Sequence, residues 1–358
     1  MPTATACREQ GEAPPVDSTT TPDIHRPPGR YALAVAIAGV GMLAAAAASL
    51  AVGVRSISPA ATLAAFTAYD PVDIDHLIIR DVRLPRTALG AVVGAALGVS
   101  GALMQGLTRN PIADPGLLGV NAGASVLVVA GLKLGWIGGM ATLVPSAFVG
   151  ALIASGLVYL LGWLGPGGPT PFKLVMAGVV ISAFLISITQ AIVSTDAGVL
   201  NPFRTWIVGS LASRSFDVML GALPAVAVGV IAALLLGPRL DALALGDDLS
   251  GAQGIDLLRT RLVTAAVAAL LVGAAVAAAG PLTFVGLVVP HIARLLVGPD
   301  YRRIIVLSAA LAPTLVLASD TVGRVIARPA EVEVGVVTAL VGAPYFLAMV
   351  LRRRMVAL

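Results

Sequence analysis

Apolar stretches of about twenty residues follow one another along almost the whole chain, and this succession restricts the fold more than any other feature. Hydrophobic residues make up 58% of the sequence and charged residues only 12%. A soluble domain usually has roughly 25% charged residues. Inside a bilayer each backbone polar group needs a partner within the protein, and helices provide one. The sequence therefore predicts an all-α, polytopic membrane protein.

The number of spans follows from the length of each apolar stretch. A helix crosses the hydrocarbon core with about 20 apolar residues. On this criterion we expect ten transmembrane helices in one domain, residues 31–358, with short third and eighth spans. The expected spans are residues 31–53, 86–107, 115–132, 141–164, 172–194, 218–237, 260–279, 282–297, 304–324 and 334–351.

Residues 1–30 differ in composition, being rich in Pro, Thr and charged side chains. Such a segment cannot bury enough apolar surface to fold, so we expect a disordered cytoplasmic tail. The tail is too long and too acidic for the basic region of a signal peptide. No small-residue cleavage site follows the first span either.

The basic residues are spread between the apolar runs, although the isoelectric point of about 9.6 would also suit a nucleic-acid-binding protein. This spread is the pattern of membrane topology, so we expect membrane lipid and no nucleic acid as a partner. Cys7 is the single cysteine, and His25, His76 and His291 lie far apart in the sequence. We therefore expect no disulfide, no metal site and no cofactor.

The charges of the loops favour a cytoplasmic N-terminus and a cytoplasmic C-terminus, which an even number of spans permits. The run Arg352–Arg354 after the last span strengthens this orientation. A surplus of arginines nevertheless falls on the outside, where the positive-inside rule disfavours them, and requires a separate explanation. This surplus includes Arg55, Arg80, Arg83, Arg86, Arg204, Arg214, Arg324 and Arg328.

Two small-residue stretches resemble each other, GAALGVSGALM at 94–104 and GAAVAAAGPLTF at 273–284. The first lies on a span that runs inward and the second on a span that runs outward. Together they would form an inverted repeat, as many transporters do. Chance similarity between helices rich in Gly and Ala is the alternative. The 39 glycines in either case favour close helix packing in lipid.

The chain shows no means of driving transport itself. It has no G-x-x-x-x-G-K-[ST] phosphate loop. Asp196, Asp217 and Asp320 fall near predicted span ends, so no pair of intramembrane carboxylates indicates a proton or ion pathway. We expect no enzymatic activity, and the energy for transport should come from a partner protein.

The longest predicted cytoplasmic loop, residues 238–259, alternates apolar and acidic residues. This pattern predicts one or two short amphipathic helices, interrupted by glycine and exposed below the membrane. A loop that only connects two spans would not need these apolar side chains, so we favour a docking element over an inert loop. Its candidate contact residues are Leu243, Leu245, Gly246, Asp247, Asp248, Leu249, Ala252 and Gly254.

Two further stretches contain proline within or beside predicted spans. Gly280 and Pro281 predict an external turn before the eighth span, and Pro290 would then break a short eighth helix packed inside the bundle. His291 is expected to be a hydrogen-bonded packing residue, not a ligand or a proton carrier. The other stretch predicts a turn in which Asn or Asp caps the next helix. It contains Asn110, Pro111, Asp114 and Pro115.

Six stretches stand out along the chain and cover most of its length. They are RLPR (83–86), GAALGVSGALMQGLTRNPIADPGLLGVNAGA (94–124), WIVGSL (206–211), LALGDDLSGAQGI (243–255), AAAGPLTFVGLVVPHIARLLVG (277–298) and EVGVVTALVGAPYF (333–346). In this order they resemble FecCD-type permease subunits of ABC importers for iron–siderophore complexes, haem or cobalamin. The chain is thus similar to the cobalamin importer permease. The likeness extends from about residue 31 to residue 351.

The resemblance implies a type II importer permease fold with ten spans per protomer, in agreement with the independent count. It also implies a dimer, formed with an identical copy or with a sister permease, in the cytoplasmic membrane of a prokaryote. Two ATP-binding cassette subunits and an extracytoplasmic substrate-binding protein would complete the importer. The 243–255 loop would contact the ATPase, although Ser250, Gly251 and Gln253 replace the alanine, arginine and leucine expected there.

The resemblance also offers a reason for some of the outside arginines. Arg83, Arg86 and Arg324 match positions that pair with acidic residues on the two lobes of the binding protein. A planar guanidinium suits this task because it binds a carboxylate through two hydrogen bonds. Snorkelling of arginines at helix ends is the alternative, but it does not explain why they collect on the disfavoured side. We therefore favour a docking role.

The expected function is that of the membrane-spanning permease subunit of an ATP-driven importer for a metal chelate. A ferric siderophore is the favoured substrate. Haem and cobalamin are alternatives, since an apolar cavity lined by small residues suits all three. The scarcity of buried charges argues against an ion-coupled secondary transporter. Broken helices and small-residue packing argue against a membrane scaffold without transport activity.

Overall fold

The computed structural model describes residues 28–164, 170–252 and 254–351, and over these residues it contains helices and loops but no strand. The predicted N-terminal tail lies almost wholly outside this part of the chain, as does Arg352–Arg354. The first half contains α1 (Pro28–Ala51), α2 (Pro59–Thr67), α3 (Ile74–Leu77), the π-helical turn η2 (Ile78–Arg83), α4 (Leu84–Thr108), the 3₁₀ turn η3 (Pro115–Leu118), α5 (Val120–Leu134) and α6 (Met140–Trp163). The second half contains α7 (Pro171–Thr195), α8 (Ala197–Ile207), α9 (Phe216–Ala244), α10 (Asp247–Ala252), α11 (Leu257–Ala279), α12 (Val285–Val297), α13 (Tyr301–Ile326) and α14 (Val334–Leu351).

The ten predicted spans correspond one by one to ten of these helices. Seven are long and apolar enough to cross a membrane: α1, α4 with the turns before it, α6, α7, α9, α11 and α13. The other three, α5, α12 and α14, are shorter apolar helices. The all-α membrane fold is therefore confirmed.

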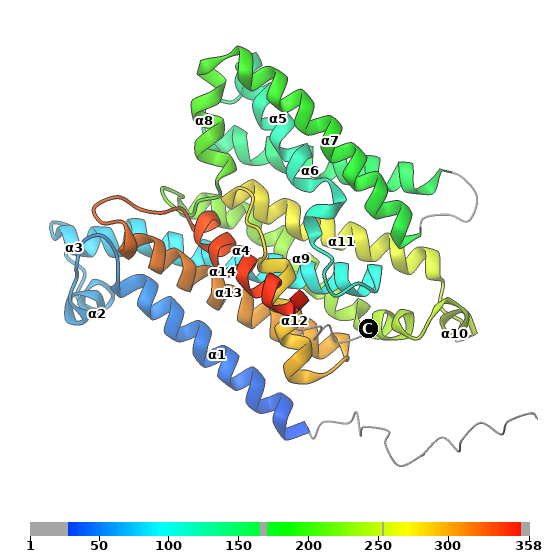
Figure 1. Cartoon of the computed structure of the whole chain (residues 1–358). Coiled ribbons are helices and arrows are strands. Elements are labelled where there is room, and N and C mark those ends of the chain that lie inside the picture. Colours follow the sequence, from blue (N-terminus) through cyan, green and yellow to red (C-terminus); the bar gives the residue numbers. More distant parts are fainter. Residues whose placement is uncertain (1–27, 165–169, 253, 352–358) are drawn as a thin grey trace, which may run out of the picture.

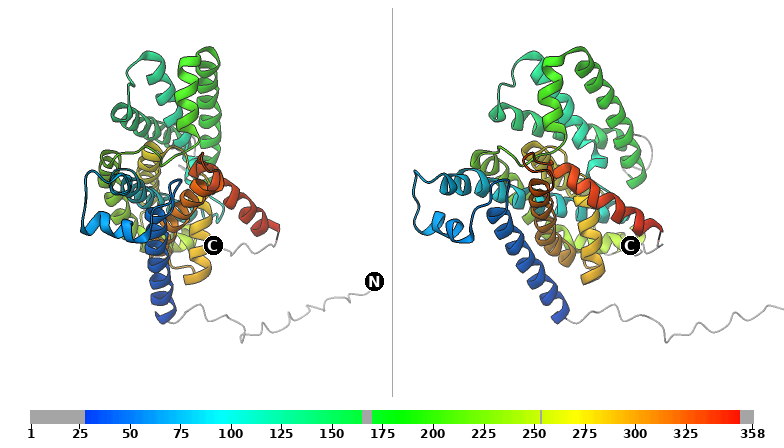
Figure 2. Two further views of the ribbon diagram at one scale, coloured as in Figure 1. Left: turned by 90° about the vertical axis from the view of Figure 1, so that its left-hand side faces the viewer. Right: turned by 60° about the vertical axis from the view of Figure 1, so that its left-hand side comes forward.

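Helix α4 lies at the centre of the bundle, where it contacts α9, α11, α12 and α13. On one side of this centre α5, α6, α7 and α8 pack together, and on the other side α1 packs against α13 (Figures 1 and 2). The pair α2 and α3 lies at one end of the bundle and α10 at the opposite end, as Figure 1 shows. We call these the α2 end and the α10 end.

The first stretch of the suggested inverted repeat lies on α4, and the second lies on α11 and the turn after it. These are the two most buried of the seven long helices. These two helices also pack against each other. Burial on all sides explains why both consist of small apolar residues without a polar face. The repeat symmetry itself stays a prediction.

Glycines on α4 allow its backbone to touch its neighbours directly. A Cβ atom at Gly94 would lie 2.6 Å from Cα of Pro313, and one at Gly98 would lie 2.6 Å from the carbonyl oxygen of Ser308. A Cβ atom at Gly101 would overlap the carbonyl oxygen of Gly286 on α12. Small residues at such crossings bring helices together in lipid, where no hydrophobic effect does so.

Pro290 does not break the eighth span as the sequence predicts. Helix α12 runs without interruption from Val285 to Val297 with Pro290 inside it. Proline has no amide hydrogen for the carbonyl group four residues earlier, which here is that of Gly286. That carbonyl oxygen instead packs directly against Gly101 of α4. The expectation that this segment is packed inside the bundle is confirmed, since most of α12 is buried.

His291 is a buried packing residue, exposing 1% of its surface. Nδ1 of its ring has no hydrogen-bond partner among the described residues. The ring lies edge-on to Tyr345 of α14, with 6.4 Å between the ring centroids. His291 thus joins α12 to α14 by aromatic packing.

We predict that Gly101→Ala destabilises the permease, because its new methyl group has only backbone atoms to displace. The cost should be about 1–3 kcal/mol, as for other overpacked cores, and would appear as a lower unfolding midpoint in detergent. Gly156→Ala in α6 is the matched control, since a Cβ atom there meets nothing within 4 Å. Equal midpoints for the two variants would show that the α4–α12 contact is not tightly packed.

Candidate functional site

The three arginines expected to dock a binding protein lie together at the α2 end but are buried. Arg83 is the last residue of η2, Arg86 lies in the first turn of α4, and Arg324 lies in the last turn of α13. They expose 4%, 5% and 2% of their surfaces. The packing of α1 and α13 around the start of α4 encloses them. These side chains are therefore buried within the bundle and are not exposed on the surface of the α2 end.

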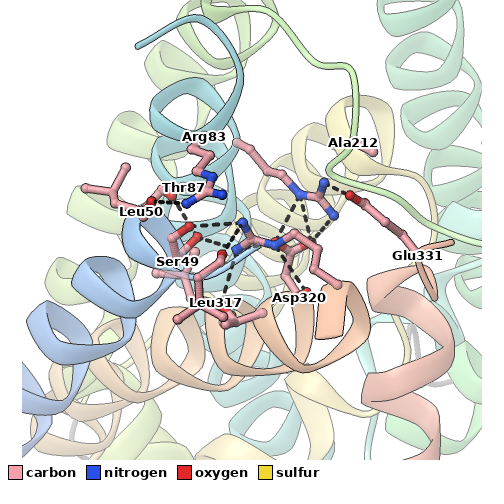
Figure 3. A network of polar contacts seen from close by, with 12 residues as sticks. Ser49, Leu50, Arg83, Thr87, Ala212, Leu317, Asp320 and Glu331 are labelled. Carbon is pink, nitrogen blue, oxygen red and sulfur yellow. Dashed lines mark hydrogen bonds and ion pairs between the residues drawn. The ribbon is translucent and has the colours of Figure 1, made fainter. Parts of the chain in front are cut away.

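Asp320 of α13 is the central acceptor of this cluster (Figure 3). Arg86 donates to both of its carboxylate oxygens, with Nη2–Oδ1 at 2.8 Å and Nε at 3.0 Å from each oxygen. Nη2 of Arg324 lies 3.2 Å from Oδ2 of the same carboxylate. Arg86 also pairs with Glu331, whose Oε2 lies 2.8 Å from Nη1. A buried charge is costly unless it is paired in this way.

The remaining donors of the cluster cap the C-terminal end of α1. Arg324 donates through Nη1 to the carbonyl oxygens of Ser49 and Val52, both at 3.0 Å. Arg83 donates through Nη1 to those of Leu50 and Ala51, both at 2.7 Å. The last carbonyl groups of a helix lack partners within it, and positive charge at that end is favourable. Because the last turn of α1 has no basic residue of its own, η2 and α13 supply the charge.

Asp320, Glu331 and Ser49 are residues of this cluster that the sequence did not single out. Asp320 appears in the sequence only as a carboxylate near a span end. Its spacing of four residues from Arg324 on one helix was a usable signal for an ion pair. The contacts with Arg86 and Ser49 join segments far apart in the chain, and no local pattern indicates them.

We predict that Asp320→Asn strongly destabilises the permease, because it leaves Arg86 and Arg324 without their shared buried charge. Breaking a buried ion pair from one side typically costs about 3–5 kcal/mol. The unfolding free energy in detergent would measure this loss. Asp217→Asn is the control, since Asp217 is an exposed carboxylate in the first turn of α9. Equal stability of the two variants would contradict a structural role for the cluster.

Three of the distinctive stretches meet at a second place, where glycines bring their backbones together. The Ser210 amide donates to the Ala279 carbonyl oxygen at 2.7 Å, and the Gly335 amide donates to the Gly209 carbonyl oxygen at 3.1 Å. Gly209 and Gly280 both adopt φ of +78°, a backbone conformation that favours glycine. We call this contact between residues 206–211, 279–281 and 335 the glycine junction. The turn predicted at Gly280–Pro281 is present beside α8 and α14, and its external location stays a prediction.

The cytoplasmic loop is shorter than the predicted residues 238–259, because α9 continues to Ala244 and α11 begins at Leu257. Between them lies one short helix, α10, at the α10 end. It lies between Gly246 and Gly254, whose φ angles are +109° and +74°. Leu245 and Leu249 are 56% and 58% exposed. Leu243 is only 1% exposed and belongs to the core, so it cannot serve as a surface contact.

Ser250 attaches α10 to the end of α9. Its hydroxyl group is fully buried and lies 2.6 Å from the Ala242 carbonyl oxygen and 2.5 Å from that of Gly246. One acceptor lies in the last turn of α9 and the other just after α9, so a single hydroxyl group holds α10 against the end of α9. The departure from the family pattern at Ser250 thus has a structural role.

The predicted turn after α4 is also present. Oδ1 of Asn110 accepts a hydrogen bond from the Ile112 amide at 3.1 Å. Oδ1 of Asp114 accepts one from the Gly116 amide at 2.7 Å and so caps η3, which begins with Pro115. The third predicted span is therefore divided into η3 and α5. No group of three or more His, Cys, Asp or Glu side chains in the described ranges could hold a metal ion.

The model of the FecCD transport family matches residues 41–352. The chain belongs to the FecCD transport family. Over 329 residues it is 41% identical to the ferric enterobactin transport system permease protein FepD of Escherichia coli K12, covering 91% of this chain and 98% of FepD. Over 283 residues it is 39% identical to the cobalamin import system permease protein BtuC of Halobacterium salinarum, covering 79% and 76%. A solved structure of a metal-chelate type ABC transporter in an inward-facing conformation matches with a TM-score of 0.78 and 25% identity, covering 89% and 98%.

Membership of the family establishes the kind of protein. This FecCD chain is a membrane permease subunit of an ABC importer and works with separate ATPase subunits and a binding protein. ATP hydrolysis belongs to the ATPase subunits, so the permease is not an enzyme. It lies in the inner membrane of a prokaryote. The predicted importer is thus confirmed, in preference to a secondary transporter or a scaffold.

Proposed function

We propose that this permease works as a dimer, with an identical copy or a sister permease, and imports a ferric siderophore. The observation that carries the proposal is that the two candidate contact sites for partner proteins lie at opposite ends of the bundle. An exposed pair of leucines lies at the α10 end, and the buried arginine cluster lies at the α2 end. FepD, named for ferric enterobactin, supports a siderophore as the substrate, and BtuC, named for cobalamin, keeps cobalamin as the second candidate.

The contacts of α10 support its role in coupling to an ATPase. Leu245 and Leu249 present an apolar surface that a partner protein would cover. Ser250 transmits a push on α10 to the end of α9. The end of α9 is in turn joined to the start of α13, because Asp241 accepts a hydrogen bond from the Tyr301 amide at 2.7 Å. Closure of the ATPase subunits would then drive alternating access at the interface of the dimer.

The docking role of Arg83, Arg86 and Arg324 stays a prediction. Internal acceptors occupy all three guanidinium groups, so docking requires that one of these contacts be exchanged. The pair between Arg86 and Glu331 is suited to such an exchange, because the Glu331 side chain is 32% exposed. A carboxylate of the binding protein would then take the place of Glu331.

Substrate identity can be tested by uptake into proteoliposomes that contain the permease with its ATPase and binding protein. We expect ATP-dependent uptake of a ferric siderophore and little uptake of cyanocobalamin. The reverse preference would overturn the siderophore assignment and leave the importer mechanism intact. Purification of the tagged permease would show which chain accompanies it: a second copy indicates a homodimer, and a different permease chain indicates a pair of sister permeases.

We predict that replacing Leu245 and Leu249 together by Asp abolishes transport and transport-stimulated ATP hydrolysis. Loss of buried apolar contacts at a protein interface typically costs about 2 kcal/mol or more. Membrane insertion should be unaffected, because both side chains lie outside the core. Leu134→Asp is the control, since Leu134 is 71% exposed and ends α5, away from α10. Normal uptake by the double variant would remove α10 from the ATPase interface.

The proposed orientation places both termini in the cytoplasm, and the single cysteine offers a direct test. A maleimide that cannot cross membranes should label Cys7 in inside-out vesicles but not in intact spheroplasts. Cys7→Ser combined with Ser56→Cys should reverse this pattern, because Ser56 is exposed in the loop between α1 and α2 at the opposite end. Labelling of Cys7 from the outside would refute the orientation.

A further inference from the structure

A fourth arginine on the same side of the bundle is as buried as the cluster but differs in its contacts. Arg214 lies in the loop between α8 and α9 and exposes 7% of its surface. Arg83, Arg86 and Arg324 each contact carboxylate or carbonyl oxygens of the chain. Among the described residues, no oxygen accepts a hydrogen bond from Arg214. This contrast identifies Arg214 as a buried cation without an oxygen partner.

The only contact of Arg214 with an acceptor in the described chain is through Nη1, to the sulfur atom of Met140. A thioether is a weak acceptor. Nε of Arg214 is buried and has no partner. Glu333 is the carboxylate that acts on Arg214 electrostatically, but no ion pair within 4.0 Å joins them. Burial lowers the pKa of Arg214 and the charge of Glu333 counteracts this, as expected for an incompletely paired cation.

Arg214 lines a cavity of ≈ 590 Å³. Binding sites for small molecules usually have volumes of about 300–1,000 Å³ and combine apolar walls with a few polar groups. Here Leu132 and Ile137 contribute apolar surface, and Ser210 contributes a hydroxyl group. Trp206 also lines the cavity, and its indole Nε1–H is a second buried donor that has no partner within the described ranges. Two unused donors around one cavity indicate a ligand that supplies acceptors.

The loop that carries Arg214 is held in place before any ligand arrives. Its start belongs to the glycine junction, where the Ser210 amide binds the Ala279 carbonyl oxygen. The Ser210 hydroxyl group then accepts a hydrogen bond from the Ala212 amide at 3.1 Å. Ser213 adopts φ of +55°, which is uncommon for a residue other than glycine. These constraints fix the backbone directly before Arg214. A donor that is held in place before binding loses less entropy when the ligand arrives.

We propose that this cavity binds a carboxylate group of the transported metal chelate at Arg214. The proposal rests on the proposed function, because it assigns a binding site to the substrate of the importer. A carboxylate would replace the thioether as the partner of the guanidinium through charge-assisted hydrogen bonds. The negative charge of Glu333 would repel the carboxylate of the chelate. This repulsion would keep the affinity low enough for the chelate to be released from the cavity during transport.

The test measures binding of gallium citrate, a carboxylate-rich analogue of a ferric chelate, to the full-length permease in lipid nanodiscs by calorimetry. Arg214→Gln should weaken binding about tenfold or more, because a charge-assisted hydrogen bond is lost. Glu333→Gln should strengthen binding, because a repelling charge is removed. A misfolded variant cannot bind more tightly, so these opposite effects separate a binding role from a structural one.

Two controls complete the test. Arg80→Gln removes a positive charge from η2, outside the cavity, where Arg80 lies over the Tyr69 ring, and should leave the affinity unchanged. Gallium desferrioxamine, a hydroxamate chelate without carboxylates, should show no dependence on Arg214. Wild-type permease that fails to bind gallium citrate, or equal affinities of the Arg214 and Glu333 variants, would overturn the proposal. Absence of ATP-dependent uptake of every chelate by the assembled importer would instead overturn the proposed function.

Discussion

The close approach of α4 to α12 and α13 is the contact on which the rest of the structure depends. Lipid tails are as apolar as leucine, so apolar helices gain little by leaving lipid for each other. Dense packing has to hold them together, and Gly94 and Gly101 permit it by placing backbone against backbone. At Gly101 the backbone of α4 lies directly against Gly286, in the turn of α12 before Pro290. The same crossing brings the start of α4 beside the end of α13, where the arginine cluster forms.

Arginines on one side of this membrane protein serve two different physical purposes. Arg83 and Arg324 complete the hydrogen bonds at the end of α1, and Arg86 shares Asp320 with Arg324. These contacts explain part of the surplus of outside arginines by the needs of the fold itself. Arg214 is equally buried but lacks an oxygen partner in the described chain, which is why it points to a ligand. Arg214 therefore differs from the other three arginines in its hydrogen-bond partners and not in its degree of burial.

Helix α13 connects the two ends of the bundle. At its start, the Tyr301 hydroxyl group accepts a hydrogen bond from Arg294 of α12 at 2.7 Å, and the Tyr301 amide is bound by Asp241 of α9. Its last turns carry Asp320 and Arg324. A helix held at both ends can transmit a displacement between the α10 end and the α2 end. Coupling between the two sites would then be carried by continuous packed contacts, as in other proteins with discrete alternative states.

The sequence by itself determined the class of protein, the ten hydrophobic helices and the turns at Asn110, Asp114 and Gly280, and its motifs indicated the family. These features depend on local composition and spacing, which can be read from the sequence without knowing which segments contact each other in the folded protein. Only the tertiary structure decided the contacts of the candidate sites. Arg86 reaches Asp320 across 234 residues and Arg324 reaches Ser49 across 275 residues. The partner of a buried charge depends on which helices lie side by side, and the close approach of neighbouring helices at the glycines of α4 contributes to that arrangement.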